Sequence, residues 1–195
     1  MSKFADKITN YIMNKGIIDP DDYDIYHYGF QTGLELIICL TVSAIIAGFM
    51  DLFIEYVVVL SVLLPLRAYV CGIHMERFVS CFLCSVILVT CGPYIIQKVL
   101  ITKEIMLALS IVVMIILHNL SHITTKAQCD SDEVRFFTIQ RKRILIYIFI
   151  LQGIFFVISA TECMKQALYA LFVALFSVFA QVLLIKINKR TTNYT

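Results

Sequence analysis

The chain has 195 residues, of which 60% are hydrophobic and only 15% charged, and its mean hydropathy is +0.86. A soluble domain could not hide this much apolar surface from water, so the composition excludes one. The net charge of +2 gives no reason to expect a nucleic-acid partner. Because no alternation of apolar and polar residues with period two is sustained, we expect an all-α, polytopic transmembrane helical protein rather than a barrel.

Residues 1–16 predict an amphipathic helix that lies on the membrane surface. Its apolar face carries Phe4, Ile8, Tyr11 and Ile12, and Gly16 is expected to end it. The segment does not read as a secretory signal peptide, because it lacks an uninterrupted apolar core. Residues 19–28 contain four aspartates and three tyrosines and are expected to form a connector at the level of the lipid headgroups.

Six apolar stretches within residues 34–187 predict six transmembrane helices, so that residues 1–195 form a single integral membrane domain. The stretches are Leu36–Met50, Leu52–Leu66, Phe78–Gln97, Ile105–Thr125, Ile144–Thr161 and Gln166–Ile185. The second is the weakest, because it contains Glu55 and ends at Pro65. It spans the membrane only if Glu55 lies near an interface, and is otherwise a re-entrant or tilted segment.

The lysines and arginines are distributed unevenly between the two sides that six spans create. All but three fall on the side that holds both termini; the exceptions are Lys98, Lys103 and Lys165. Positive charge is retained in the cytoplasm, so both termini are predicted to be cytoplasmic. Removing the doubtful second span would place the segment from Arg67 to Arg77 on the opposite side and weaken the bias.

Seven cysteines are present, and most fall in apolar stretches or on the predicted cytoplasmic side, where disulfides are not expected. One of them, Cys81, follows His74 at the start of an apolar stretch. A thiol with a pKa near 8.5 is mostly protonated at neutral pH, and an imidazole can take its proton. The pair is therefore a candidate nucleophile and base.

Spacing constrains how this pair could work. Seven residues of continuous helix span about 10 Å, whereas a base must come within about 3 Å of the proton that it removes. The chain must therefore bend, and Gly72 offers the backbone freedom to do so. We expect His74 on a cytoplasmic loop that folds over Cys81, with Cys81 in the first turns of a helix that begins near Phe78.

Arg67, Gly72, His74 and Cys81 are spaced as Arg, four residues, Gly, one residue, His, six residues, Cys. This pattern, in a small six-span protein with an amphipathic N-terminal helix, resembles the accessory gene regulator B (AgrB) family of membrane cysteine endopeptidases. The resemblance extends over nearly the whole chain and includes a basic, polar loop, here from Ser121 to Arg143.

The resemblance implies that His74 and Cys81 are the catalytic pair, supported by Arg67 and Gly72. It implies an AgrD-like pro-peptide as substrate, cut in its C-terminal part and cyclised to a thiolactone or lactone quorum-sensing signal of a Gram-positive bacterium. It calls for no metal or organic cofactor. The lipid bilayer is the other partner, and a second copy of the chain is a candidate for a homodimer.

Other readings of the same residues stay open. Cys84 forms a C-x-x-C pair with Cys81 that could be redox-active or bind metal, although we read Cys84 as a buried packing residue. His118 and His122 share a helical face and could bind metal, but are read as interfacial polar residues. Glu76 is a candidate third group that orients His74. A small transporter and a non-catalytic membrane scaffold are the alternative functions.

Overall fold

The computed structural model describes residues 2–69, 78–128 and 131–192, except for the side chains at 2–3, 20, 78–81, 126–128, 131–132 and 188–192. These residues form helices and short connections, without strands, which confirms the predicted all-α class. The elements are α1 (Ser2–Asn14), the 3-10 turn η1 (Pro20–Asp22), α2 (Tyr23–Phe49), α3 (Phe53–Tyr69), α4 (Phe78–Gln97), α5 (Lys103–Gln128), α6 (Ser131–Val157) and α7 (Thr161–Thr192).

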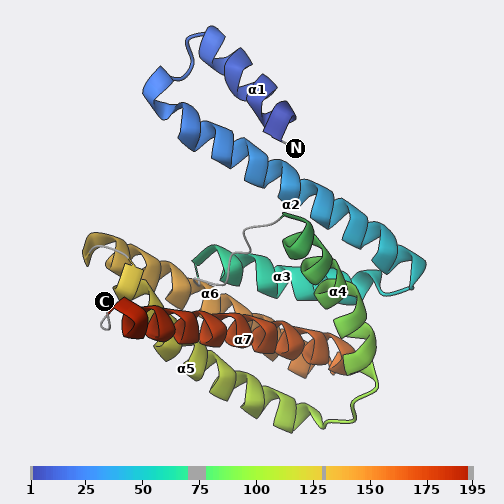
Figure 1. Ribbon diagram of the computed structural model, residues 1–195. Helices are drawn as coiled ribbons and strands as arrows, with labels where there is room; N and C mark the ends of the chain where they lie inside the picture. Colours follow the sequence, from blue (N-terminus) through green and yellow to red (C-terminus); the bar gives the residue numbers. More distant parts are fainter. Residues whose placement is uncertain (1, 70–77, 129–130, 193–195) are drawn as a thin grey trace.

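Helix α7 is the centre of the bundle and packs against α3, α4, α5 and α6 (Figure 1). Its buried face recurs every three or four residues, at Ala167, Ala170, Leu171, Ala174 and Val178. Because lipid tails are as apolar as leucine, helices in a membrane associate through close packing, which small residues such as alanine permit. This alanine-rich face therefore explains why the other helices gather around α7.

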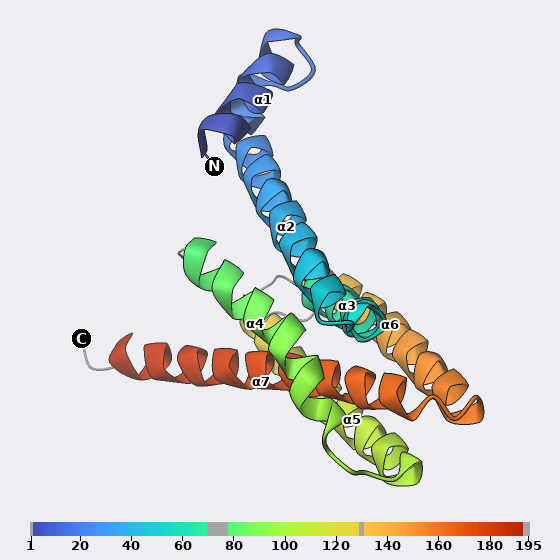
Figure 2. The ribbon, with the colours of Figure 1, turned by 90° about the vertical axis from the view of Figure 1, so that its right-hand side faces the viewer.

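Helices α2 to α7 reverse direction at each connection (Figure 1). The connections after α2, α4 and α6 lie at one end of the bundle, and the C-terminal end of α7 and the start of α6 lie at the other (Figure 1). Helix α2 extends beyond the bundle, and α1 lies beside its N-terminal half (Figure 2).

Each of the six predicted spans coincides with a helix, but the number of spans stays a prediction. Among the described residues, three helical segments are long and apolar enough to cross a membrane, namely Tyr23–Phe49, Lys103–Thr125 and Thr161–Ile187. Helix α3 has 17 residues and is about 26 Å long, slightly short of the ~30 Å hydrocarbon core. Glu55 lies in the first turn of α3. Pro65 lies inside α3 rather than at its end, and the helix continues to Tyr69.

The N-terminal helix ends where the sequence predicted. Gly16 adopts a left-handed conformation with φ of 68°. Its N–H donates to the carbonyl of Met13 at 2.9 Å, and the N–H of Ile17 donates to that of Ile12 at 3.2 Å. This pair of bonds is a Schellman motif, which closes a helix. Phe4 and Tyr11 are exposed, as an interfacial helix requires, while Ala5 is buried.

Three boundaries differ from the predictions. Residues 23–28 belong to α2 rather than to a headgroup connector, because acidic residues at and just before the first turn stabilise a helix N-terminus. Residues 121–143 are mostly helical, so the predicted basic loop is wrong: α5 continues to Gln128 and α6 begins at Ser131. Helix α6 ends at Val157, four residues before the predicted end, with Ser159 in the left-handed region at φ of 56°.

Candidate functional site

The predicted site lies where α3 ends and α4 begins, and these two helices pack against each other. Arg67 is in the last turn of α3 and is exposed. Gly72 and His74 lie between the two helices, outside the described residues. The geometry between His74 and Cys81 therefore stays a prediction.

Helix α4 begins at Phe78, as expected, so the backbone of Cys81 is in its first turn. The side chain of Cys81 lies outside the described residues. The first turn of a helix carries partial positive charge from unpaired backbone N–H groups, which favours a negatively charged atom there. A cysteine in this position is thus placed where a thiolate is stabilised.

Three side chains of α7 hold α4 in position by donating hydrogen bonds to its carbonyl groups. The Tyr169 hydroxyl donates to the carbonyl of Leu88 at 2.8 Å, and Gln166 Nε2 donates to that of Pro93 at 3.2 Å. Lys165 Nζ donates to the carbonyl of Gln97, the last residue of α4, at 3.2 Å. A cation at a helix C-terminus stabilises the helix, so Lys165 acts as a cap.

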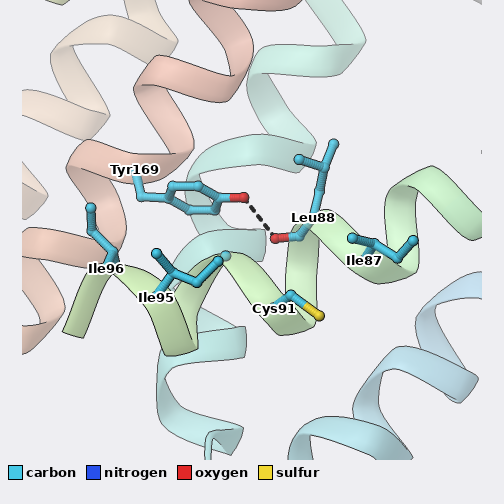
Figure 3. A pocket seen from close by; sticks show the side chains of 7 residues that line it. Ile87, Leu88, Cys91, Ile95, Ile96 and Tyr169 are labelled. Atoms are coloured by element: carbon cyan, nitrogen blue, oxygen red, sulfur yellow. Dashed lines mark hydrogen bonds between the residues drawn. The ribbon is translucent and has the colours of Figure 1, made fainter. Parts of the chain in front are cut away.

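Figure 3 shows Tyr169 crossing from α7 to reach the carbonyl of Leu88 on α4. A Cβ atom added at Gly92 would overlap the Tyr169 ring, so the two helices approach this closely only because residue 92 is glycine. An apolar cavity of about 220 Å³ adjoins this contact and includes Cys91 in its lining. The contact fixes the end of α4 that lies away from Cys81.

Lys165 is also part of a polar cluster that joins α3, α4 and α7 at the end of the bundle opposite the candidate site. Its ammonium pairs with Glu162 at 2.8 Å, and Gln97 Nε2 donates to Glu55 Oε1 at 2.8 Å. Glu55 lies in the first turn of α3, at this end of the bundle, and its predicted position near a membrane interface stays a prediction. Lys165 is only 7% exposed, whereas the sequence analysis placed it in a loop between two spans.

The prediction that Cys84 is buried is wrong, because Cys84 is exposed on the surface of α4. A three-residue offset from Cys81 turns it by about 300° around the helix, so it lies near Cys81 on a face that α7 does not cover. Among the residues that the structure describes, Cys39, Cys84, Cys91 and Cys163 are not joined in disulfides.

Arg141 is a buried charged residue that the sequence did not single out. It was counted as a basic loop residue, yet it is fully buried between α5 and α6. Its guanidinium donates to the hydroxyls of Ser121 at 2.6 Å, Thr125 at 3.4 Å and Thr138 at 3.2 Å. The sequence signal was the four-residue spacing of Ser121 and Thr125, which places both hydroxyls on one face of α5.

Aromatic rings join the C-terminal end of α3 to the first turns of α6, at the same end of the bundle as the candidate site. The Tyr69 ring centroid lies 6.5 Å from that of Phe136 and 6.4 Å from that of Phe137. These contacts set where α3 ends, and so where the segment that carries His74 begins. His118 and His122 are half-buried on α5, and in the described part of the chain no group of three potential ligands surrounds them.

A family model described as accessory gene regulator B matches residues 5–185, more than nine tenths of the chain. The chain belongs to this family. Membership implies a membrane protein that takes part in processing the pro-peptide of an agr quorum-sensing system. No curated protein and no solved structure matches the chain.

Proposed function

We propose that the chain is a membrane-embedded cysteine endopeptidase in which Cys81 is the nucleophile and His74 the general base. The observation that carries this proposal is the Arg-x4-Gly-x-His-x6-Cys spacing inside a family match to residues 5–185. The start of α4 at Phe78 supports it, because a cysteine in a first helical turn is stabilised as a thiolate.

The proposed reaction begins when His74 takes the thiol proton and the Cys81 sulfur attacks a peptide carbonyl of the bound pro-peptide. The C–N bond breaks, the nitrogen leaves as an amine with the proton from His74, and the N-terminal part stays attached as a thioester. A cysteine thiol or serine hydroxyl of that part then attacks the same carbonyl. This second step releases the Cys81 thiol and gives a thiolactone or lactone.

Supporting groups complete the proposed site. Arg67 is exposed at the end of α3, where its guanidinium can order the segment before α4 or contact an acidic part of the pro-peptide. Gly72 gives the backbone freedom that brings His74 back toward Cys81. Both termini and this end of the bundle are proposed to be cytoplasmic, in a Gram-positive bacterium, and a homodimer is a further proposal.

The decisive experiment incubates the purified protein, in lipid, with its cognate pro-peptide and measures the mass of the intact protein. We expect an adduct equal to the N-terminal part of the peptide, attached at Cys81 and cleaved by hydroxylamine. Cys81→Ala should abolish both adduct and cleavage. Cys84→Ser, a thiol loss one turn further along the same helix, is the matched control and should retain cleavage.

His74→Ala tests the base. We expect a rate of adduct formation lower by about 10²–10⁴-fold, the usual contribution of general acid–base catalysis, with partial recovery at raised pH as the thiolate forms unaided. Normal cleavage by Cys81→Ala would refute the peptidase proposal and favour a scaffold. Equal loss in Cys81→Ser and Cys84→Ser would instead favour a redox or metal site.

Orientation is tested separately, with an impermeant thiol reagent applied to intact cells that express cysteine-substituted variants. A cysteine at Arg135, which is exposed near the start of α6, should be protected, whereas one at Leu100, which is 96% exposed between α4 and α5, should react. Labelling at Arg135 from outside would overturn the proposed topology.

A further inference from the structure

A groove between α5 and α6, on the outer surface of the bundle, has no role in the proposed reaction. Its volume is about 400 Å³, and α5 lines it with Ile111, Met114, Ile115, His118 and Asn119, whereas α6 lines it with Lys142, Leu145, Ile146 and Phe149. This volume is in the range of sites that bind small ligands.

The groove is polar at one end and apolar along the rest. The two helices run in opposite directions (Figure 1). His118 lies ten residues before the end of α5 and Lys142 eleven residues after the start of α6, so the polar lining residues gather at the same end of the groove. From Lys142 to Phe149 the groove extends about 10 Å along the helix, within the ~15 Å hydrocarbon depth of one leaflet. The groove therefore matches an amphipathic ligand in both polarity and length.

The apolar wall of the groove is open to the surroundings. Ile115, Ile146 and Phe149 are 57%, 59% and 50% exposed. Both helices contain predicted membrane spans, and large exposed apolar side chains on membrane-spanning helices contact acyl chains rather than water. An acyl chain therefore fits this wall better than a folded partner, which would have to displace lipid.

The polar end carries an uncompensated positive charge. Lys142 is exposed, and none of the carboxylates in the described residues forms an ion pair with it. It lies two residues before the uncharged stretch of α6, which begins at Ile144, and so lies near headgroup level. An anionic phosphate ester is the complementary group at this height, since basic residues at the membrane surface attract anionic lipids.

We propose that this groove binds one anionic phospholipid, with its headgroup phosphate at Lys142 and one acyl chain along Ile115, Ile146 and Phe149. The bound lipid fills the space between α5 and α6 and ties the hairpin they form to the membrane surface. The proposal depends on the membrane location of the helices and not on the peptidase reaction.

The test measures lipid binding to the full-length protein in neutral detergent by native mass spectrometry, with phosphatidylglycerol and phosphatidylcholine of identical acyl chains. We expect one saturable site that prefers phosphatidylglycerol. Lys142→Gln should weaken phosphatidylglycerol about fivefold, weaken phosphatidylcholine less because choline already neutralises its phosphate, and remove the preference. Lys142→Arg should retain the preference.

Two control variants test whether lipid binding depends on the groove itself, rather than on any surface charge or on any change to the surface. Lys186→Gln removes an exposed lysine of α7 outside the groove and should retain the preference. Ile146→Trp should fill the groove and reduce binding of both lipids, whereas Leu183→Trp, on exposed α7 surface, should not.

Three outcomes would overturn the proposal. One is an equal affinity of the protein for the two lipids. A second is an equal effect of Lys142→Gln and Lys186→Gln, which would indicate non-specific attraction. The third is full displacement of phosphatidylglycerol by glycerol phosphate at the same concentration, which would indicate an anion site that makes no use of the acyl groove.

Discussion

Replacing Gly92 with alanine should destabilise the protein, although the same change in most helices is stabilising. Alanine has a better helix propensity than glycine by about 1 kcal/mol. At Gly92, however, the new Cβ would overlap the Tyr169 hydroxyl and ring and lie 2.6 Å from its Cε1 atom. The ring cannot move freely, because its hydroxyl donates to the carbonyl of Leu88 at 2.8 Å.

The structure sets the size of the effect. Inserting a methyl group into a closely packed contact costs about 1–3 kcal/mol. Losing the hydrogen bond from Tyr169 to Leu88 costs about 1 kcal/mol more. The gain in helix propensity offsets about 1 kcal/mol of this. We therefore expect Gly92→Ala to lower the free energy of unfolding by about 1–3 kcal/mol.

The assay is unfolding of the purified protein in mixed micelles, followed by loss of helical circular dichroism. Gly153→Ala on α6 is the matched control, because a Cβ there has no heavy atom within 4 Å in the described structure, and it should be stabilised or unchanged. In a Tyr169→Ala background the cost of Gly92→Ala should disappear, which a double-mutant cycle measures. The contact would be refuted by equal stabilities of Gly92→Ala and Gly153→Ala, or by no coupling to Tyr169.

Three further changes test other contacts in the same unfolding assay. Ser159→Gly should stabilise the protein by about 0.5–1 kcal/mol, because glycine tolerates the positive φ at this helix end, and a loss of stability would contradict that reading. Ser121→Ala should cost about 1.5–3 kcal/mol, the worth of a hydrogen bond to the charged Arg141, and a cost under 0.5 kcal/mol would show that the other partners of Arg141 suffice. Lys165→Met should cost about 1–2 kcal/mol, because it removes the cap of α4. Lys98→Met removes only an exposed cation–π contact and should cost about 0.5 kcal/mol. Equal costs of the two changes would exclude the cap.

The positions of the helices could be predicted from the sequence because they depend on local properties. An apolar stretch of sufficient length has to form a helix in a bilayer, where no water can satisfy the backbone. Residues 78–97 are helical over the predicted range, and the end of α1 at Gly16 follows from the conformational freedom of glycine. The spacing of residues from Arg67 to Cys81 could also be seen in the sequence, and the family match to residues 5–185 confirms the family that this spacing suggested. The roles of the motif residues stay a prediction.

The helix ends near residues 128 and 157 could not be predicted in the same way. Residues 121–143 resemble a loop in composition, but the described residues among them belong to α5, which ends at Gln128, and α6, which begins at Ser131. These two helices pack against each other. Arg141 is the clearest case: its charge suggested solvent, and three hydroxyls from neighbouring turns allow it to be buried.

Which residues of different helices meet was decided by the tertiary structure alone. Two examples are the contact of Gly92 with Tyr169 and the cap of Lys165 on Gln97, which join residues 77 and 68 positions apart. A local sequence pattern cannot predict pairs so far apart in the chain. The exposure of Cys84 was decided in the same way, since an apolar helix in a membrane can turn any face toward lipid. The sequence by itself determined that the chain forms apolar helices suited to a membrane. Packing determined which helix faces meet, because close fit between side chains is a property of pairs of helices.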